Sequence, residues 1–323
     1  MEWLVIGIPV VVGFAFVMGV LYDYEIRKLF ARMQSRRGPL FIVPRDLRGG
    51  LGTTRVFQTL YDILKLFSKS QTFRPSSSKY FIAAPFIALG CMVLATLLLD
   101  IGGISVFGDY DFSMVVISYL LFTIPLSLII GGASSSSPFG ALSVRREIEL
   151  MLSYEVAFVI GIFSAALLAN SLSIARVVAY QANTLPFLLI NPFAAAAVFF
   201  AIVGKLHMKP FDTTEAEAEI VSGYFTEYSS RLLGTFLASR MLLLFVLVTL
   251  FIDLFVFIPV VPLLLYFVEG FLFVLALTLV HTVMPRYRID QAVSWFTRIP
   301  LVLALIGLVW SLTLKYGLLG AVW

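Results

Sequence analysis

Long apolar runs separated by polar connections dominate the chain. Eight of these runs have roughly the 20 apolar residues that a helix needs to cross a lipid bilayer. They cover about residues 3–22, 80–99, 113–132, 150–169, 187–205, 234–256, 260–282 and 299–317. Because eight spans leave no room for a separate soluble domain, the pattern predicts an all-α membrane protein. We expect a bundle of about eight transmembrane helices that forms a single polytopic membrane domain over residues 1–323.

The polar residues concentrate in four longer connections, at about residues 23–79, 133–149, 205–231 and 283–298. In the first, a basic extension continues the first helix until Gly38-Pro39 breaks it. The stretch 53–70 then carries apolar residues at 56, 57, 60, 63, 64 and 67, the spacing of an amphipathic helix. We expect it to lie along the membrane interface, where it either only anchors the chain or turns Lys65 and Lys69 toward headgroups or a partner protein.

Composition supports a lipid environment and gives an orientation. Hydrophobic residues make up 60% of the chain and charged residues 13%, with a mean hydropathy of +0.98, which excludes an ordinary soluble domain. Of the 23 Lys and Arg, only Arg176 and Lys315 fall outside the four long connections and their flanks. Basic residues favour the cytoplasmic side. We therefore expect a multi-pass protein of the cell membrane with cytoplasmic long connections and both termini outside. The pI near 9.1 then needs no nucleic-acid partner.

Few residues could hold a cofactor. The single cysteine, Cys91, cannot bind an iron–sulfur cluster or a conventional zinc ion by itself. The two histidines, His207 and His281, are far apart in sequence, which disfavours a haem with two histidine ligands. We expect no cofactor and no metal in this chain.

One short segment holds about a quarter of the acidic side chains. Five of the 19 lie between residues 205 and 231: Asp212, Glu215, Glu217, Glu219 and Glu227. The D-x-x-E spacing of Asp212 and Glu215 predicts a helix start with a capping box. On such a helix Asp212, Glu215 and Glu219 share a face while Glu217 points away, so they would raise one another's pKa. Alternatives are helix capping or a solvated face, but we expect a cluster that handles protons or cations.

More charges lie at the start of the fourth apolar run. If the chain is helical from about residue 144, Arg145 and Arg146 can each pair with Glu149. Glu147 and Glu155 then lie on one flank, about 12 Å apart. Glu155 is deep enough in the apolar run that it must be paired, protonated or facing water. We expect a titrating group in a polar path rather than a merely neutral, hydrogen-bonded carboxyl.

Two further charges lie within apolar runs. Arg240 is in the sixth and Glu269 in the seventh. A long Arg side chain can reach water from such a position, whereas a Glu cannot. We therefore expect Glu269 to face other helices.

Four stretches resemble one family. Residues 209–229, KPFDTTEAEAEIVSGYFTEYS, match the pattern P-F-D-x-x-E-A-E-x-E-L/I-V-x-G-Y-x-x-E-Y-S of the quinone-proximal membrane subunit (the H-type subunit) of respiratory complex I and of membrane-bound nickel–iron hydrogenases. In the same order along the chain, RMQSRRGP (32–39), FQTLYDILKLFSK (57–69) and MPRYRIDQ (284–291) resemble further motifs of that family. Together they cover most of the predicted cytoplasmic side.

The resemblance implies a cofactor-free, non-redox subunit that joins a peripheral electron-transfer arm to ion-translocating, antiporter-like membrane subunits. Iron–sulfur clusters, and a nickel–iron site in hydrogenases, would belong to partner subunits. The implied ion pathway and coupling residues are Asp212, Glu215, Glu217, Glu219, Glu227, Glu155, Glu147, Glu149 and Glu269. The implied interface with the peripheral arm comprises Arg36, Arg37, Gln58, Asp62, Lys65, Arg286 and Arg288.

The chain also departs from the family pattern. Arg240 stands where a family glutamate is expected, and an Arg/Gly-rich insertion covers residues 45–54. The stretch RREIELMLSYE (145–155) resembles the hydrogenase branch more than the respiratory branch. It favours a ferredoxin-linked hydrogenase or a sulfur-reducing complex over a quinone oxidoreductase linked to NADH or F420. Proton and sodium ion both stay open as the coupling ion.

Two other classes remain to be weighed. A secondary transporter with acidic ion sites at mid-membrane should show internal repeats and spans broken near their centre, which the sequence does not clearly show. A purely structural anchor for a soluble enzyme would not need the acids for ion pumping.

Overall fold

The computed structural model describes residues 2–36, 55–71, 78–102, 104–256 and 263–316. Most of them are helical. The elements are α1 (Glu2–Met33), η2 (Arg55–Phe57), α2 (Gln58–Ser68), α3 (Lys79–Leu98), β1 (Asp100–Ile101), β2 (Ile104–Ser105), α4 (Ser113–Ala133), α5 (Pro138–Ala169), α6 (Ile174–Ala182), α7 (Phe187–Ile190), α8 (Pro192–Lys205), α9 (Glu217–Ile220), η3 (Gly223–Phe225), α10 (Ser230–Phe251), η4 (Ile252–Val256), α11 (Leu263–Val283), α12 (Ile289–Arg298) and α13 (Pro300–Lys315). The strands β1 and β2 form one short antiparallel pair.

Seven helical segments within the described residues are long and apolar enough to cross a membrane. They cover Gly7–Met33, Lys79–Leu98, Ser113–Ala133, Pro138–Ala169, Ser230–Val256, Leu265–Val283 and Ile289–Lys315. The fifth predicted run, 187–205, is instead divided into α7 and the 14-residue α8, because Asn191 caps a new helix that begins at Pro192. The all-α membrane fold is therefore confirmed, with one span shorter than expected.

Helix boundaries follow local chemistry. Pro138, Pro192 and Pro300 each occupy the first turn of a helix, where the missing N–H costs no internal hydrogen bond. Helix α5 ends at Asn170, whose left-handed backbone (φ 52°) closes the helix. Helix α1 continues through the basic extension to Met33, as predicted, while Gly38-Pro39 and the insertion 45–54 lie outside the described residues.

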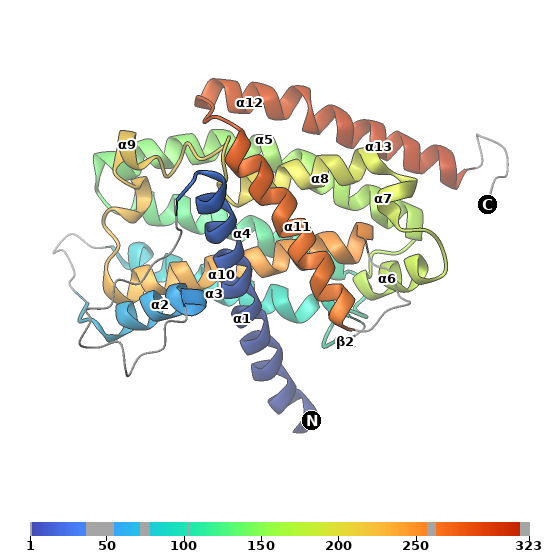
Figure 1. The fold of residues 1–323 in the computed structure, drawn as a ribbon, viewed down its shortest axis with the longest axis horizontal. Coiled ribbons are helices and arrows are strands. Elements are labelled where there is room, and N and C mark those ends of the chain that lie inside the picture. The colour runs from blue at the N-terminus through green and yellow to red at the C-terminus, as the bar shows by residue number, and fades with distance from the viewer. Residues whose placement is uncertain (1, 37–54, 72–77, 103, 257–262, 317–323) are drawn as a thin grey trace.

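Most of the long helices lie side by side, and two cross them obliquely. In Figure 1, α3, α4, α5, α8, α10 and α13 run roughly along the long axis, whereas α1 and α11 run diagonally across them. Helix α5 packs against α4, α8 and α13, and α10 packs against α1 and α3. Small residues allow this close approach: a Cβ at Gly307 of α13 would lie 2.9 Å from the Cβ of Ala194 in α8.

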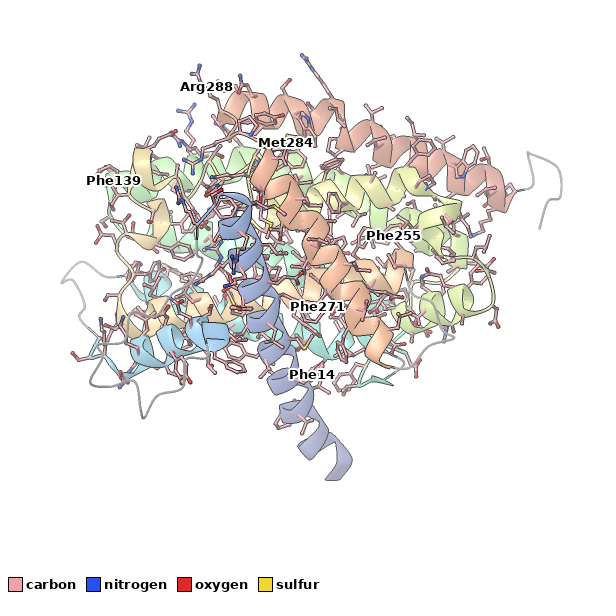
Figure 2. The ribbon with its side chains drawn as sticks, viewed as in Figure 1. Phe14, Phe139, Phe255, Phe271, Met284 and Arg288 are labelled. Atoms are coloured by element: carbon pink, nitrogen blue, oxygen red, sulfur yellow. The ribbon has the colours of Figure 1, made fainter. Side chains whose placement is uncertain are left out.

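Aromatic side chains fill the crossing of α1, α10 and α11. Phe14 contacts the ring of Phe267 at 5.5 Å, and Tyr22 contacts the ring of Phe271 at 5.3 Å. Figure 2 labels Phe14 and Phe271 on α1 and α11, which run beside each other in that view. These rings fix the oblique helices against the bundle.

The predicted amphipathic helix is present as α2, preceded by the single turn η2. Its Ile63 is buried with Val20 of α1 and Met241 of α10, whereas Leu64 and Lys65 on the other face are exposed. Figure 1 places α2 at the same end of the bundle as α9. The apolar stripe of α2 therefore packs on the bundle and leaves a mixed face free.

Candidate functional site

The acidic segment between α8 and α10 is not the single helix that its spacing predicts. Residues 206–216 form successive turns, followed by the four-residue α9 and the single turn η3. The predicted capping box at Asp212 and Glu215 is therefore wrong, as is their shared helical face with Glu219. Contacts with the bundle outweigh local helix preference here.

Those contacts hold the acidic segment against α5 and α12. The Ser143 hydroxyl donates a hydrogen bond to the Thr214 carbonyl (2.5 Å), and the Arg146 guanidinium donates to the Thr213 carbonyl (2.9 Å). The ring of Phe211 is fully buried and lies 4.3 Å from the ring of Phe296. The segment is thus a packed part of the bundle end.

Three acids that were expected to share a face instead meet three different cations. Arg286 Nη2 lies 2.5 Å from Asp212 Oδ2. Arg146 Nη1 lies 2.7 Å from Glu219 Oε2, and Arg240 Nη1 lies 2.8 Å from Glu215 Oε2. Their mutual repulsion is thereby relieved, because each carboxylate has a nearby positive charge.

Behind these pairs, His207 joins two acids. Its Nε2 lies 2.8 Å from Glu147 Oε2, and its Nδ1 lies 3.4 Å from Glu215 Oε1. Glu147 is completely buried and also accepts a hydrogen bond from the Tyr154 hydroxyl (3.3 Å). The backbone of His207 is left-handed (φ 50°), a conformation that terminates α8 and is uncommon without a specific need. One imidazole therefore bridges α5 and the acidic segment.

Deeper in the bundle, Glu155 of α5 pairs with Lys205 of α8. Lys205 is 3% exposed, and its ammonium lies 4.5 Å from the centre of the Phe158 ring and 5.3 Å from that of Tyr154. The carboxylate expected to need a partner at this depth thus has one, while its Oε1 has no hydrogen-bond partner among the described residues. An ion pair surrounded by aromatic rings is screened little by water.

We call the connected group the buried ionic cluster: Glu147, Glu155, Lys205, His207, Glu215 and Arg240. Its members come from α5, α8, the acidic segment and α10. Glu147 acts electrostatically on both Lys205 and His207, so the deep pair and the histidine bridge are coupled. Any proton gained or lost by one member is therefore felt by its neighbours.

Burial and neighbouring charges shift the pKa values of three groups near the surface opening of the cluster at Asp212, which we call the mouth. Burial lowers the pKa of His207, but Glu147 and Glu215 outweigh it, so the net shift is upward. Burial raises the pKa of Glu215, yet Arg240 and His207 dominate and lower it overall. Burial raises the pKa of Asp212 despite the Arg286 pair, with a smaller upward contribution from Glu215. The expectation that the acids raise one another's pKa therefore fails at Glu215 because cations face it.

Several members of the site escaped sequence reasoning. Lys205 and His207 resemble ordinary residues at the end of a span, and Arg240 departs from the family pattern. The structure accounts for Arg240: its guanidinium neutralises Glu215 and lies 5.8 Å from the centre of the Phe225 ring. An isolated cation within an apolar run is the signal that points to a buried acid.

The other predicted pathway residues lie outside the cluster. Glu149 pairs with Arg145 on the surface (3.2 Å), as its spacing predicts, whereas Arg146 pairs with Glu219 instead. Glu217 lies in α9, and Glu227 is half-buried just before α10. Glu269 is buried within α11, in agreement with the expected orientation toward other helices.

The described members of the predicted interface lie at the same end as the acidic segment. Figure 2 shows Arg288 at the start of α12, above α9 in that view. Arg36, Lys65 and Arg288 are exposed, and Gln58 and Asp62 of α2 are half-buried. Arg286 is engaged by Asp212, and Arg37 lies outside the described residues.

One further buried carboxyl was not predicted as a site. Asp253, in the π-helical η4, is completely buried, accepts a hydrogen bond from the Tyr266 hydroxyl (3.1 Å) and also interacts with the backbone of Asp100. Within the described residues, no group of three or more His, Cys, Asp or Glu is arranged so that it could hold a metal ion.

Comparisons with known proteins agree with this architecture. The chain is 29% identical to the H subunit of NADH-quinone oxidoreductase from Bacillus thuringiensis (strain Al Hakam) over 310 residues, which cover 92% of this chain and 90% of the relative. The corresponding protein of Bacillus cereus (strain AH187) matches equally well. Among solved structures, a chain of the membrane-bound sulfane sulfur reductase, described as an archaeal respiratory membrane complex, superposes with a TM-score of 0.83 at 24% identity. That match covers 94% of this chain and 98% of the other.

These relatives confirm the resemblance that the four sequence motifs indicated. The family model described as NADH dehydrogenase matches residues 6–312, almost the whole chain, and the chain belongs to that family.

Proposed function

We propose that this chain is the membrane coupling subunit of a complex I-like oxidoreductase, linking a peripheral electron-transfer arm to ion translocation. The single observation that supports this role best is the buried ionic cluster. It connects the surface-accessible mouth at Asp212 with the Glu155–Lys205 pair inside the bundle. Keeping so many charges within a membrane domain is costly and is typical of an ion pathway.

The geometry supports a transfer of charge from the mouth inward. A charge change near Asp212 acts on Glu215 and His207, which already interact with it electrostatically. His207 can pass its proton toward Glu147 or Glu215, since its two nitrogens face one acid each. A change in the charge of Glu147 then alters the electrostatic interaction between Glu155 and Lys205. Neighbouring antiporter-like subunits would respond to that change in charge.

The electron-transfer cofactors are proposed to reside in partner subunits. Iron–sulfur clusters need several thiolates, and this chain has one cysteine. The peripheral arm would contact residues of the three stretches 32–39, 57–69 and 284–291 that resemble family motifs. These residues are Arg36, Arg37, Gln58, Asp62, Lys65, Arg286 and Arg288. The excess of basic residues at this end supports a cytoplasmic location for it, with both termini outside.

The electron acceptor has two candidates. The stretch RREIELMLSYE favours a hydrogenase or a sulfur-reducing complex, and the fold is similar to that of a sulfane sulfur reductase chain. The Bacillus relatives at 29% identity are named for quinone, which favours a quinone oxidoreductase as the second candidate. Assays of the intact complex with protons, sulfur compounds and quinones as acceptors separate the two.

The coupling role is tested by Glu215→Gln and Glu155→Gln in the intact complex within membrane vesicles. We expect electron transfer to continue while ion pumping per electron falls about tenfold or more, because the acids can no longer change charge. Glu149→Gln is the matched control: the family resemblance implies a pathway role for Glu149, but its side chain pairs with Arg145 at the surface of the same α5 helix, outside the cluster. It should leave pumping unchanged.

Three outcomes would contradict the proposal. Normal pumping in both cluster variants would make the chain a structural anchor. Loss of pumping in the Glu149→Gln control as well would show that any α5 carboxylate has the same effect. Transport by the purified chain alone, without partner subunits, would show a secondary transporter.

A further inference from the structure

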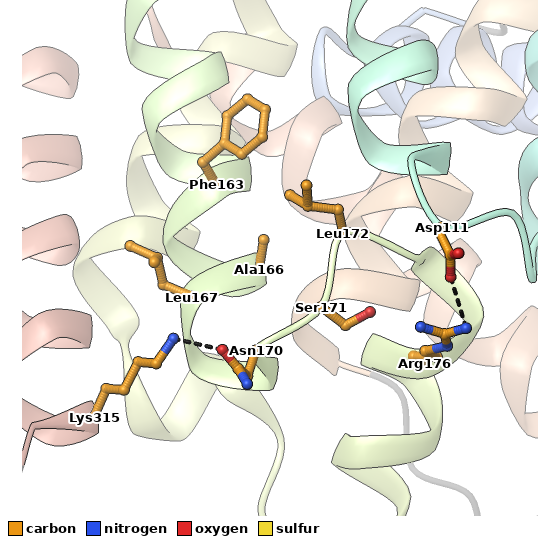
Figure 3. Close-up of a pocket in the computed structure, with 9 residues that line it drawn as sticks. All are labelled: Asp111, Phe163, Ala166, Leu167, Asn170, Ser171, Leu172, Arg176 and Lys315. Carbon is orange, nitrogen blue, oxygen red and sulfur yellow. Dashed lines mark hydrogen bonds and ion pairs between the residues drawn. The ribbon is translucent and has the colours of Figure 1, made fainter.

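A cavity of about 520 Å³ opens at the end of the bundle away from α9. It lies where α5 and α13 end and α6 begins (Figure 3). The residues that line it are Asp111, Phe163, Ala166, Leu167, Asn170, Ser171, Leu172, Arg176 and Lys315. None of them belongs to the buried ionic cluster.

Two cations from distant parts of the sequence meet at this cavity. Arg176 belongs to α6 and Lys315 is the last residue of α13. They are the two basic residues that the sequence places away from the long connections. Figure 3 shows them on opposite sides of the cavity. Among the described residues, the fold thus brings the two basic side chains of this end of the bundle to one opening.

The present partners of these cations hold them weakly, so an anionic ligand could replace those partners. Arg176 Nη2 lies 2.6 Å from Asp111 Oδ1, but both side chains are 63% exposed. Exposed ion pairs contribute little to stability. Lys315 donates a hydrogen bond to the neutral amide oxygen of Asn170 (2.6 Å). The lining therefore contains two cations and one carboxylate, which gives the cavity a net positive charge.

Apart from Ser171, the remaining wall is apolar. Phe163, Ala166 and Leu167 come from the last two turns of α5, and Leu172 follows the turn at its end. Since α5 and α13 are spanning segments, their shared end lies at the boundary between hydrocarbon and headgroups. A cationic rim above an apolar wall at that depth matches the two halves of a phospholipid.

We propose that this cavity binds an anionic phospholipid of the adjacent leaflet. Its phosphate lies between Arg176 and Lys315, and the start of an acyl chain lies along the α5 wall. The guanidinium provides a planar pair of donors for phosphate, and the ammonium adds a second positive charge. Free phosphate would use the cations but not the apolar wall, and an acidic protein segment would not need a wall at lipid depth.

The test uses the intact complex, stripped of loosely bound lipid. It is mixed with vesicles of phosphatidylglycerol, vesicles of phosphatidylcholine or inorganic phosphate, and the bound molecules are counted by native mass spectrometry. The variant Arg176→Gln/Lys315→Gln should bind phosphatidylglycerol about thirtyfold more weakly at one site, from the usual contribution of each basic residue near an anionic membrane surface. The control Lys79→Gln/Arg298→Gln removes two exposed cations elsewhere and should bind like wild type.

A second variant separates the sources of phosphate. Leu167→Gln keeps both cations and makes the wall polar, so it should weaken binding of phosphatidylglycerol about tenfold and leave inorganic phosphate unaffected. Equal binding by the wild type and the double-cation variant would overturn the proposal. Equal binding of phosphatidylcholine and phosphatidylglycerol to the wild type would also overturn it. So would full displacement of phosphatidylglycerol by inorganic phosphate. Finally, if the double-cation variant lost a partner subunit and not a lipid, the cavity would be a protein interface.

Discussion

Two groups of carboxyls inside this bundle differ in their partners: one group faces cations and the other does not. In the buried ionic cluster, Glu155 faces Lys205 and Glu215 faces Arg240. In the second group, formed by Asp253, Tyr266 and Glu269, no basic side chain within the described residues lies within ion-pair distance of either acid. Asp253 has the Tyr266 hydroxyl at 3.1 Å. Figure 2 shows Phe255, in η4, far from the α9 end.

The difference separates charge handling from polar packing. A buried acid beside a cation can stay ionised, and its charge can be transferred or re-paired. A buried acid beside a hydroxyl is best satisfied as a hydrogen-bonded neutral group. The bundle therefore concentrates mobile charge at the end that holds the acidic segment, and the second group is the natural reference for it.

Removal of Lys205 should have the largest effect. Lys205→Met leaves Glu155 buried without its cation, so we expect the free energy of unfolding to fall by about 3–5 kcal/mol and the complex to assemble poorly. The double variant Lys205→Met/Glu155→Gln should recover most of this loss. Thermal unfolding of the solubilised complex measures both. A single variant as stable as wild type would mean that Lys205 does not compensate Glu155.

The histidine bridge should give the cluster a distinct pH dependence. The folded-state pKa of His207 lies above its ordinary value of 6.5. Its stabilising contribution is therefore complete below pH 6.5 and is lost as the pH rises through the folded pKa. The wild-type melting temperature should fall by a few degrees over that range. His207→Gln should remove this decline.

A second variant locates the origin of the pH effect. Glu147→Gln removes the acid that raises the pKa of His207 most, so the decline should shrink and move to lower pH. An unchanged profile in both variants would show that His207 does not titrate as the bridge.

The smallest effect is expected in the second group. Asp253→Asn keeps the shape of the side chain and an oxygen for the Tyr266 hydroxyl, and no cation loses its partner. We expect a change within about 1 kcal/mol in thermal unfolding, of either sign. A loss as large as that of Lys205→Met would erase the distinction between the two groups.

Local pattern predicted most of the elements but few of the contacts between them. The apolar spacing of α2 and the Arg145–Glu149 pair were correctly predicted, because both depend on residues one turn apart. The acidic segment was predicted as a helix from the same kind of spacing and is not one, because Phe211 and Thr214 are held by α12 and α5. Tertiary contacts override a weak helix preference.

The sequence by itself determined a membrane bundle with an acidic end, since apolar length and clustered carboxylates are properties of neighbouring residues. Only the tertiary structure decided which cation serves which acid. Lys205 and Glu155 are 50 residues apart along the chain, and Arg240 reaches Glu215 from another helix. Such pairings depend on how helices pack, and packing is set by side-chain shape across the whole bundle rather than by spacing along the chain.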